Sequence, residues 1–155
     1  MEQTWRPPGW WYETGKRPAN DDAYFENMCR VIFQAGLNWH VIDKKWPTTR
    51  QAFANFSISK ISAYTNKEVE CLMKDEGIVR NRGKIEAIIQ NAVLFKEIKK
   101  QYGSFQNYLD SFDKSNNYYK VVTELTSKFK WLGPSSASMF LYTVGEKIEP
   151  WDTPH

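Results

Sequence analysis

The chain is poor in cysteine and histidine, with two of each among its 155 residues: Cys29, Cys71, His40 and His155. Two cysteines cannot provide the disulfide framework of a small secreted domain, so we expect a reducing compartment, the cytoplasm with its nucleoid. Cys/His pairs at zinc spacing, a phosphate-binding glycine loop and a nucleophile elbow are all missing. We therefore predict no metal site and no cofactor, and structural or surface roles for the two histidines.

Long apolar runs are missing as well. No stretch approaches the roughly 18 apolar residues of a membrane-spanning helix, and residues 1–6 lack the pattern of a secretory signal. We therefore expect no membrane partner. The formal net charge is only +3, which permits nucleic-acid binding without indicating it. The length fits one domain that can bury a core, and we expect a monomer.

Aromatic residues, in contrast, are abundant at 15%, with seven Trp, eight Tyr and nine Phe. Such rings either fill a core or face a ligand. Residues 1–19 hold several prolines and glycines and are predicted to form an irregular arm, which carries Trp10, Trp11 and Tyr12. Residues 20–155 are predicted to form a single helical domain.

Apolar residues recur at helical spacing through most of the chain, and no convincing strand pattern occurs. The predicted fold class is all-α, a bundle of about eight short helices. The predicted helices cover 21–35, 38–45 (ended by Pro47), 48–54 (capped by Thr48 or Thr49), 66–76 (with a Thr65/Glu68 capping box and a Gly77 cap), 82–101, 105–112, 118–130 and 135–144 (capped by serine).

The segment 118–144 is predicted to form a hairpin of two helices joined by the turn Leu132-Gly133-Pro134. Backbone N–H groups from Gly133 to Ser136 at the start of the second helix suit a phosphate group, and Lys128 and Lys130 lie close in sequence. An ordinary helix pair with a glycine turn is an equal alternative. Further along, Asp152 precedes Thr153-Pro154, a pattern that also fits a helix N-cap.

Several motifs resemble, in register over residues 20–110, the DNA-3-methyladenine glycosylase I branch of the helix-hairpin-helix DNA glycosylase superfamily. They are Asp21-Asp22 with Phe25-Glu26, Gln34-Ala35-Gly36-Leu37-Asn38-Trp39, Glu76-Gly77-Ile78-Val79-Arg80-Asn81-Arg82, Lys84-Ile85, Asn91-Ala92 and Tyr102-Gly103-Ser104-Phe105. The resemblance implies a helix-hairpin-helix glycosylase fold and base-excision repair activity. The implied partner is double-stranded DNA that contains a damaged base.

The chain departs from this branch at several positions. No Cys or His precedes Cys29, so the structural zinc of the branch is expected to be absent. Val31 stands where the branch places a pocket Glu, and Asn38 where Ser is common. Asp152 instead resembles the catalytic Asp of endonuclease-III-like members. Ser135 replaces the hairpin Lys of those members that also cut the backbone, which favours a monofunctional glycosylase.

The resemblance suggests roles for individual residues. Asp152 would stabilise an oxocarbenium-like transition state at C1′ of the deoxyribose. Trp39 would stack on the extruded base, with Trp10 and Tyr12 as weaker candidates, and Gln34 and Asn38 could hydrogen-bond the base edge. Gln34 could equally satisfy helix-end backbone groups, and Trp39 could belong to the core. Arg80, Arg82 and Lys84 are candidate phosphate contacts or part of a solvated face.

Two other functions remain open at this stage. One is a DNA-binding protein with a glycosylase fold and a degenerate pocket, which Val31 and the missing zinc ligands favour. The other is a helical domain that binds a small molecule or a protein through its aromatic residues. The sequence does not identify the excised base.

Overall fold

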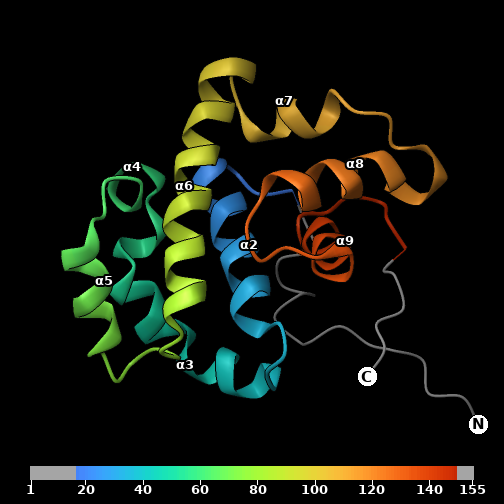
Figure 1. Ribbon diagram of the computed structural model, residues 1–155. Helices are drawn as coiled ribbons and strands as arrows, with labels where there is room; N and C mark the ends of the chain where they lie inside the picture. The colour runs from blue at the N-terminus through green and yellow to red at the C-terminus, as the bar shows by residue number, and fades with distance from the viewer. Residues whose placement is uncertain (1–16, 150–155) are drawn as a thin grey trace, which may run out of the picture.

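A computed structural model of the chain describes residues 17–149, which are helical and contain no strand (Figure 1). The elements are α2 (Asp21–Gln34), α3 (Trp39–Ala52), η1 (Ala54–Phe56), α4 (Ile58–Ile61), α5 (Asn66–Met73), α6 (Arg82–Tyr102), α7 (Phe105–Asp110), α8 (Ser115–Lys128) and α9 (Pro134–Thr143). The all-α prediction of about eight helices is therefore confirmed. None of the described helices is long and apolar enough to cross a membrane.

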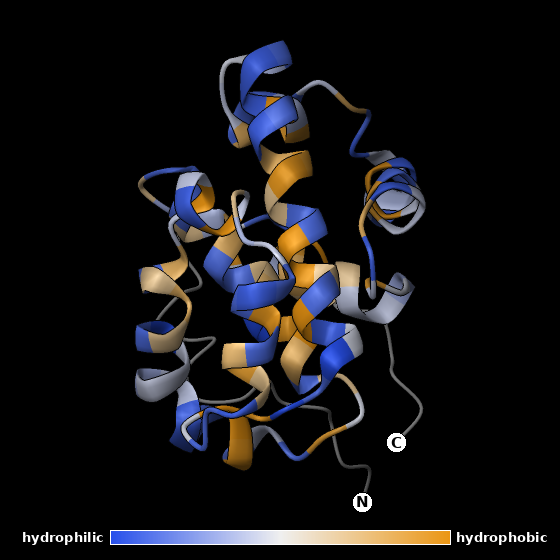
Figure 2. Ribbon diagram, turned by 60° about the vertical axis from the view of Figure 1, so that its left-hand side comes forward, coloured by the Kyte–Doolittle hydropathy of each residue, from blue (hydrophilic) through white to orange (hydrophobic). Residues whose placement is uncertain are grey.

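Helices α2 and α6 lie side by side at the centre (Figure 1), with α4 and α5 on one side, α8 and α9 on the other and α3 below. The predicted apolar stripe of α6 faces this interior, and Figure 2 shows orange, hydrophobic segments where the helices meet at the centre of the molecule. Gly103 ends α6 with φ +89°, a conformation that glycine adopts without strain. The two central helices thus form the scaffold on which the other elements pack.

Most of the aromatic residues in the described part of the chain belong to the core. Phe95 stacks on Phe105 with ring centroids 4.3 Å apart, and Trp46 stacks on Phe56 at 5.1 Å. Edge and tilted contacts connect Phe25, Phe33 and Phe129 to the same cluster. Such ring pairs contribute about 0.5–1.5 kcal/mol each beyond the area that they bury.

The acidic residues at the start of α2 connect it to distant segments. Asp21 Oδ1 accepts a hydrogen bond from the backbone N–H of Phe105, and Asp22 Oδ1 accepts one from that of Ile58. One turn later, the Glu26 carboxylate accepts from the Trp46 indole and from Arg50 on α3. The Asp21-Asp22…Glu26 motif therefore has a structural function, the attachment of α3, α4 and α7 to α2.

Helix α3 differs from the prediction. The sequence suggested two short helices separated by Pro47, but the structure has one helix that continues through the proline. Ile42, Trp46 and Thr49 pack into the core on one face, and the hydroxyls of Thr48 and Thr49 both donate to the Lys45 carbonyl. Tertiary packing thus keeps the helix continuous where local propensity favours a break.

Two predicted caps were also wrong in position. The capping box Thr65/Glu68 is confirmed, but α5 ends at Met73, and Gly77 lies in a later turn where its N–H donates to Asp75 Oδ1. In α9 the N-cap is Gly133, not a serine, because Pro134 occupies the first helical position.

Candidate nucleic-acid interface and base site

The turn between α8 and α9 has the geometry of an anion site. Gly133 is the N-cap of α9 and no side chain caps the helix. The N–H of Ala137 bonds to the Gly133 carbonyl at 2.8 Å, whereas those of Ser135 and Ser136 have no acceptor within residues 17–149. Gly133 and Pro134 are exposed. Unpaired N–H groups at an exposed helix start can bind a phosphate oxygen, which favours the phosphate-binding interpretation over a plain helix pair.

The two lysines near this turn differ in their surroundings. The Lys128 ammonium lies 3.5 Å from the Glu124 carboxylate and 5.1 Å from the centroid of the Tyr108 ring. Lys130 is exposed, and its side chain makes no ion pair with any described residue. Lys130 is therefore the better placed of the two for a phosphate contact.

Asn91 holds the backbone just before the turn, a role that the sequence analysis missed. This fully buried side chain on α6 accepts from the Lys130 N–H at 2.9 Å and donates to the Lys130 carbonyl at 3.1 Å. The side-chain nitrogen and oxygen of Asn91 therefore both bond to the backbone of Lys130 in the hairpin. An asparagine on the apolar stripe of α6 was the signal that could have identified it.

Lys84 does not lie where a phosphate contact would require it. The residue is 3% exposed, and its Nζ donates to the carbonyls of Phe33 at 3.0 Å and Ala35 at 2.7 Å. Burial lowers the pKa of this ammonium. The predicted DNA contact of Lys84 is corrected on this ground, because the side chain satisfies the last carbonyls of α2 instead.

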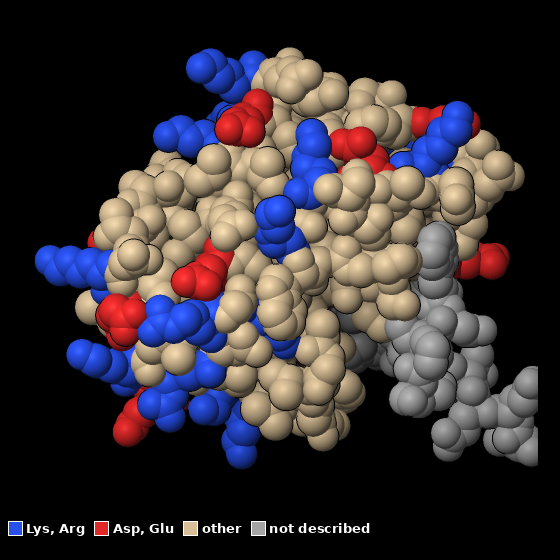
Figure 3. Space-filling model, in the orientation of Figure 1, with Lys and Arg blue, Asp and Glu red and all other residues tan. Residues whose placement is uncertain are grey.

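The other two predicted basic contacts are exposed. Arg82 pairs with Glu70 at 2.7 Å, and Arg80 has no salt bridge with a described residue. Lys and Arg side chains gather on the lower left of the face in Figure 3. Both arginines are accessible to a ligand from solvent, although Arg82 must break its salt bridge with Glu70 to bind one.

The predicted base-reading residues lie at the turn between α2 and α3. Gln34 ends α2, and its buried Oε1 has no hydrogen-bond partner among the described residues. Asn38 is the N-cap of α3, and its Oδ1 accepts from the His40 N–H at 2.8 Å, so this oxygen is engaged by the backbone. Gln34 is therefore the better candidate for a base edge.

Trp39 follows this turn at the start of α3. Its side chain is half-buried against the core, and one face of the indole stacks on the His40 imidazole with centroids 3.7 Å apart. Val31, one turn before Gln34, is 2% exposed and belongs to the core cluster. No carboxylate is supplied from that position.

The remaining predicted site residues, Asp152, Trp10 and Tyr12, lie outside the described residues, as does most of the predicted arm. Within residues 17–149 no group of three or more His, Cys, Asp or Glu side chains could hold a metal ion. Cys29 is buried in the core and Cys71 is exposed on α5. The residues described here do not fit a zinc site.

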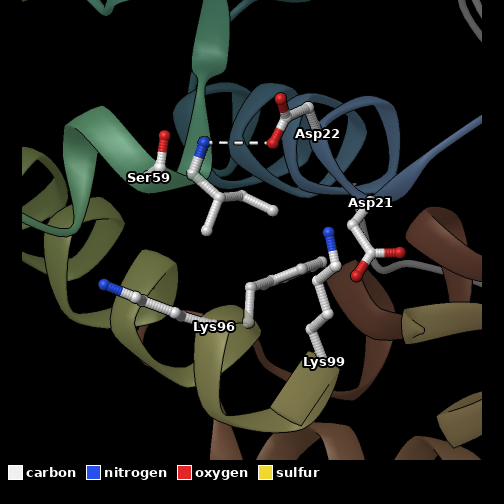
Figure 4. A pocket seen from close by; sticks show the side chains of 7 residues that line it. Asp21, Asp22, Ser59, Lys96 and Lys99 are labelled. Carbon is white, nitrogen blue, oxygen red and sulfur yellow. Dashed lines mark hydrogen bonds between the residues drawn. The ribbon is translucent and has the colours of Figure 1, made fainter. Parts of the chain in front are cut away.

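A separate hollow of about 300 Å³ lies at the opposite end of α2, between α2, α4 and α6 (Figure 4). Asp21, Asp22, Ser59, Lys96 and Lys99 line it, together with Ile58 and Phe95. Both aspartates use one oxygen each to cap another helix. The hollow lies at the end of α2 that is away from Gln34, and the two aspartates in its wall attach α4 and α7 to α2.

Comparison with known proteins connects these features. The family model of methyladenine glycosylases matches residues 11–141. The chain belongs to the methyladenine glycosylase family. Two curated relatives are a DNA-3-methyladenine glycosylase of Haemophilus influenzae, 32% identical over 74% of this chain, and DNA-3-methyladenine glycosylase 1 of Escherichia coli, 34% identical over 81%. This chain spans 62% and 66% of the lengths of those two proteins.

The fold agrees with solved structures of this glycosylase family. The 3-methyladenine DNA glycosylase I of Staphylococcus aureus superposes with a TM-score of 0.74 at 28% identity, over 84% of this chain and 79% of that one. The glycosylase-like helical fold inferred from the sequence motifs is thereby confirmed.

Proposed function

We propose that this chain is a DNA base-excision glycosylase that extrudes a damaged base from duplex DNA and hydrolyses its N-glycosidic bond. The observation that carries the proposal is the bare N-terminus of α9, with the unpaired N–H groups of Ser135 and Ser136, in a chain that matches the methyladenine glycosylase model. An anion site of this kind holds the DNA backbone without regard to sequence. Lys130 and Arg80 add charge-assisted contacts that release counterions.

The chemical step requires a carboxylate near the sugar. Cleavage of the N-glycosidic bond develops positive charge on the deoxyribose, and a carboxylate held near C1′ stabilises it and orients the attacking water. We assign this role to Asp152, which follows the hairpin in sequence. Ser135 cannot form a Schiff base, so the expected product is an abasic site with an intact backbone.

The turn after α2 is the proposed base site. The target atom is inaccessible within a stacked duplex, so the nucleotide must be extruded at a cost of a few kcal/mol. The half-buried Trp39 offers a stacking surface, and the unpartnered Oε1 of Gln34 suits a base edge that presents an N–H group. Trp10 and Tyr12 are proposed as secondary stacking residues.

The relatives are named for 3-methyladenine, so this base is the first candidate substrate. Recognition of its cationic ring by a carboxylate at position 31 is excluded, because Val31 occupies that position. We therefore expect the protein to discriminate between bases by their shape and stacking. The test must for this reason also include deaminated and oxidised bases.

A series of duplex oligonucleotides, each with one lesion, tests the proposal by the formation of alkali-labile sites. Methylated genomic DNA, with released bases identified by mass spectrometry, covers alkylation products that are difficult to place in an oligonucleotide. We expect abasic sites for at least one lesion and their loss in Asp152→Asn. Glu97→Gln, which alters an exposed carboxylate on α6, is the matched control. Activity that survives Asp152→Asn would reject the assigned mechanism.

A DNA-binding protein with a degenerate pocket is the second candidate, and Val31 favours it. This alternative predicts salt-dependent binding to duplex DNA without base release from any substrate. If salt-dependent binding is also missing, a domain that binds another ligand through its aromatic residues replaces both candidates.

A further inference from the structure

Helix α6 carries two buried polar side chains within its apolar stripe, Lys84 and Asn91. They are seven residues apart, which is close to two helical turns, and they therefore lie on one face about 10 Å apart along the axis. Each makes two hydrogen bonds to the backbone of a different element. The elements are those that carry the proposed base site and the proposed phosphate site.

Lys84 fixes the turn of the base site. Its ammonium binds the carbonyls of Phe33 and Ala35, on either side of Gln34. No carboxylate within residues 17–149 forms a salt bridge with it, and the ring of Trp131 in the hairpin turn lies 5.8 Å away. Two carbonyls at a helix C-terminus thus compensate a nearly buried charge.

Asn91 fixes the hairpin in the same manner. Its amide pairs with both the N–H and the carbonyl of Lys130, three residues before the N-cap Gly133. The Asn91 amide thus pairs with the Lys130 backbone as one β-strand residue pairs with another. The two hydrogen bonds fix the position of the turn along the axis of α6. The position of the Ser135 and Ser136 N–H groups relative to α6 follows from it.

We propose that Lys84 and Asn91 are positioning residues, which fix on one rigid helix the separation between the phosphate-binding hairpin and the base-reading turn. Neither residue touches the DNA. The inference rests on the proposed function, because the separation matters when one nucleotide must be bound at both places. Replacement of buried charged groups by apolar side chains of similar volume is often neutral or stabilising, so stability alone does not account for Lys84.

Substitutions of the two residues are expected to impair different steps, base extrusion for Lys84 and duplex binding for Asn91. Loss of the Lys84 contacts loosens the turn around Gln34, which impairs extrusion of the base while the hairpin still binds duplex. Loss of the Asn91 contacts displaces the hairpin, which weakens duplex binding first. A general loss of stability would instead reduce both properties in parallel with the melting temperature.

The test compares Lys84→Met and Asn91→Leu with the matched surface variants Lys96→Met and Gln90→Leu on the same helix. Binding is measured by fluorescence anisotropy with a labelled duplex, and extrusion by the emission of 2-aminopurine placed beside the target base. For Lys84→Met we expect duplex affinity within about twofold of the wild type and a loss of kcat of about 10- to 100-fold, with a reduced 2-aminopurine signal. For Asn91→Leu we expect a higher KM, weaker duplex binding and a salt slope smaller by about one phosphate contact.

Asn91→Asp provides the second variant if Asn91→Leu fails to fold, since it keeps an acceptor for the Lys130 N–H and replaces the amide donor by a carboxyl oxygen that faces the Lys130 carbonyl. An intermediate affinity is expected for it. The inference is overturned if folded variants bind and extrude as the wild type does, or if both lose binding and kcat equally. A wild-type protein without base release overturns the proposed function instead, and duplex binding then still tests the Asn91 contact.

Discussion

The indole of Trp131 lies against the backbone of Gly83, at the start of α6. A methyl group on Gly83 would lie 3.0 Å from Cζ2 of Trp131, which is closer than carbon atoms normally approach. Trp131 is 51% exposed and has φ +60°, a backbone conformation that is unfavourable for a bulky residue. The hairpin therefore places a large aromatic ring at its surface, beside the proposed phosphate site.

We predict that Gly83→Ala weakens duplex binding with little change in stability. A gain in helix propensity, smaller in the first turn of α6 than in a helix interior, partly offsets the crowding, whereas the displaced Trp131 shifts the hairpin turn. We expect an affinity loss of roughly fivefold, or about 1 kcal/mol, by anisotropy. The same substitution in a Trp131→Ala background should have no further effect, and an undiminished loss there would contradict this explanation.

Gly77→Ala is predicted to destabilise the fold by about 1–3 kcal/mol, because the added methyl group overpacks against Cβ of Thr48, an atom that no side-chain rotation can move. A Cβ at this position would lie 2.9 Å from Cβ of Thr48 on α3. Urea unfolding followed by circular dichroism measures the change. Thr48→Ser keeps that carbon atom and the hydroxyl, so the cost of Gly77→Ala should be unchanged in its background, whereas in a Thr48→Gly background the same substitution should cost less.

The two lysines of the hairpin are predicted to contribute unequally to DNA binding. Lys130→Gln should reduce the slope of log K against log salt by about 0.9, the value for one phosphate contact. Lys128→Gln should change it little, because this ammonium lies beside Glu124 and over the Tyr108 ring. Equal slopes for the two variants would contradict the assignment.

The two thiols are predicted to react at very different rates. Burial raises the pKa of the Cys29 thiol, with a smaller contribution from Glu26, and no solvent reaches the side chain. Cys71 is exposed on α5. Titration with a chromogenic disulfide near pH 8 should therefore show one fast equivalent in the native protein and two in guanidinium chloride. Cys71→Ser should remove the fast phase, and a fast phase that persists would place Cys29 at the surface.

Periodicity and caps were sufficient to predict the central helices. The apolar spacing of α6, the glycine at 103 and the capping box at Thr65 depend on local chemistry, and the structure confirms all three. The continuity of α3 through Pro47 depends on the core that Trp46 joins, which no local pattern contains.

The errors at the candidate site have a similar origin. Lys84 was grouped with Arg80 and Arg82 as a candidate phosphate contact, yet it lies on the stripe of Ile85, Ile88 and Asn91 that points inward. Asn38 caps α3 through its Oδ1, which no local pattern had indicated, and the contact of its amide nitrogen with a base edge stays a prediction. A polar residue within an apolar stripe was the informative signal in both Lys84 and Asn91.

The pair Asp21 and Asp22 has a consequence for the way in which the chain reaches this fold. The two carboxylates bond to backbone groups 84 and 36 residues away in sequence, at the first residues of α7 and α4. Helices form locally and fast, but contacts of such separation close long loops and slow the search for the native topology. Although helices are the only regular secondary structure in residues 17–149, the rate of folding should thus depend on when these two neighbouring aspartates find their distant partners.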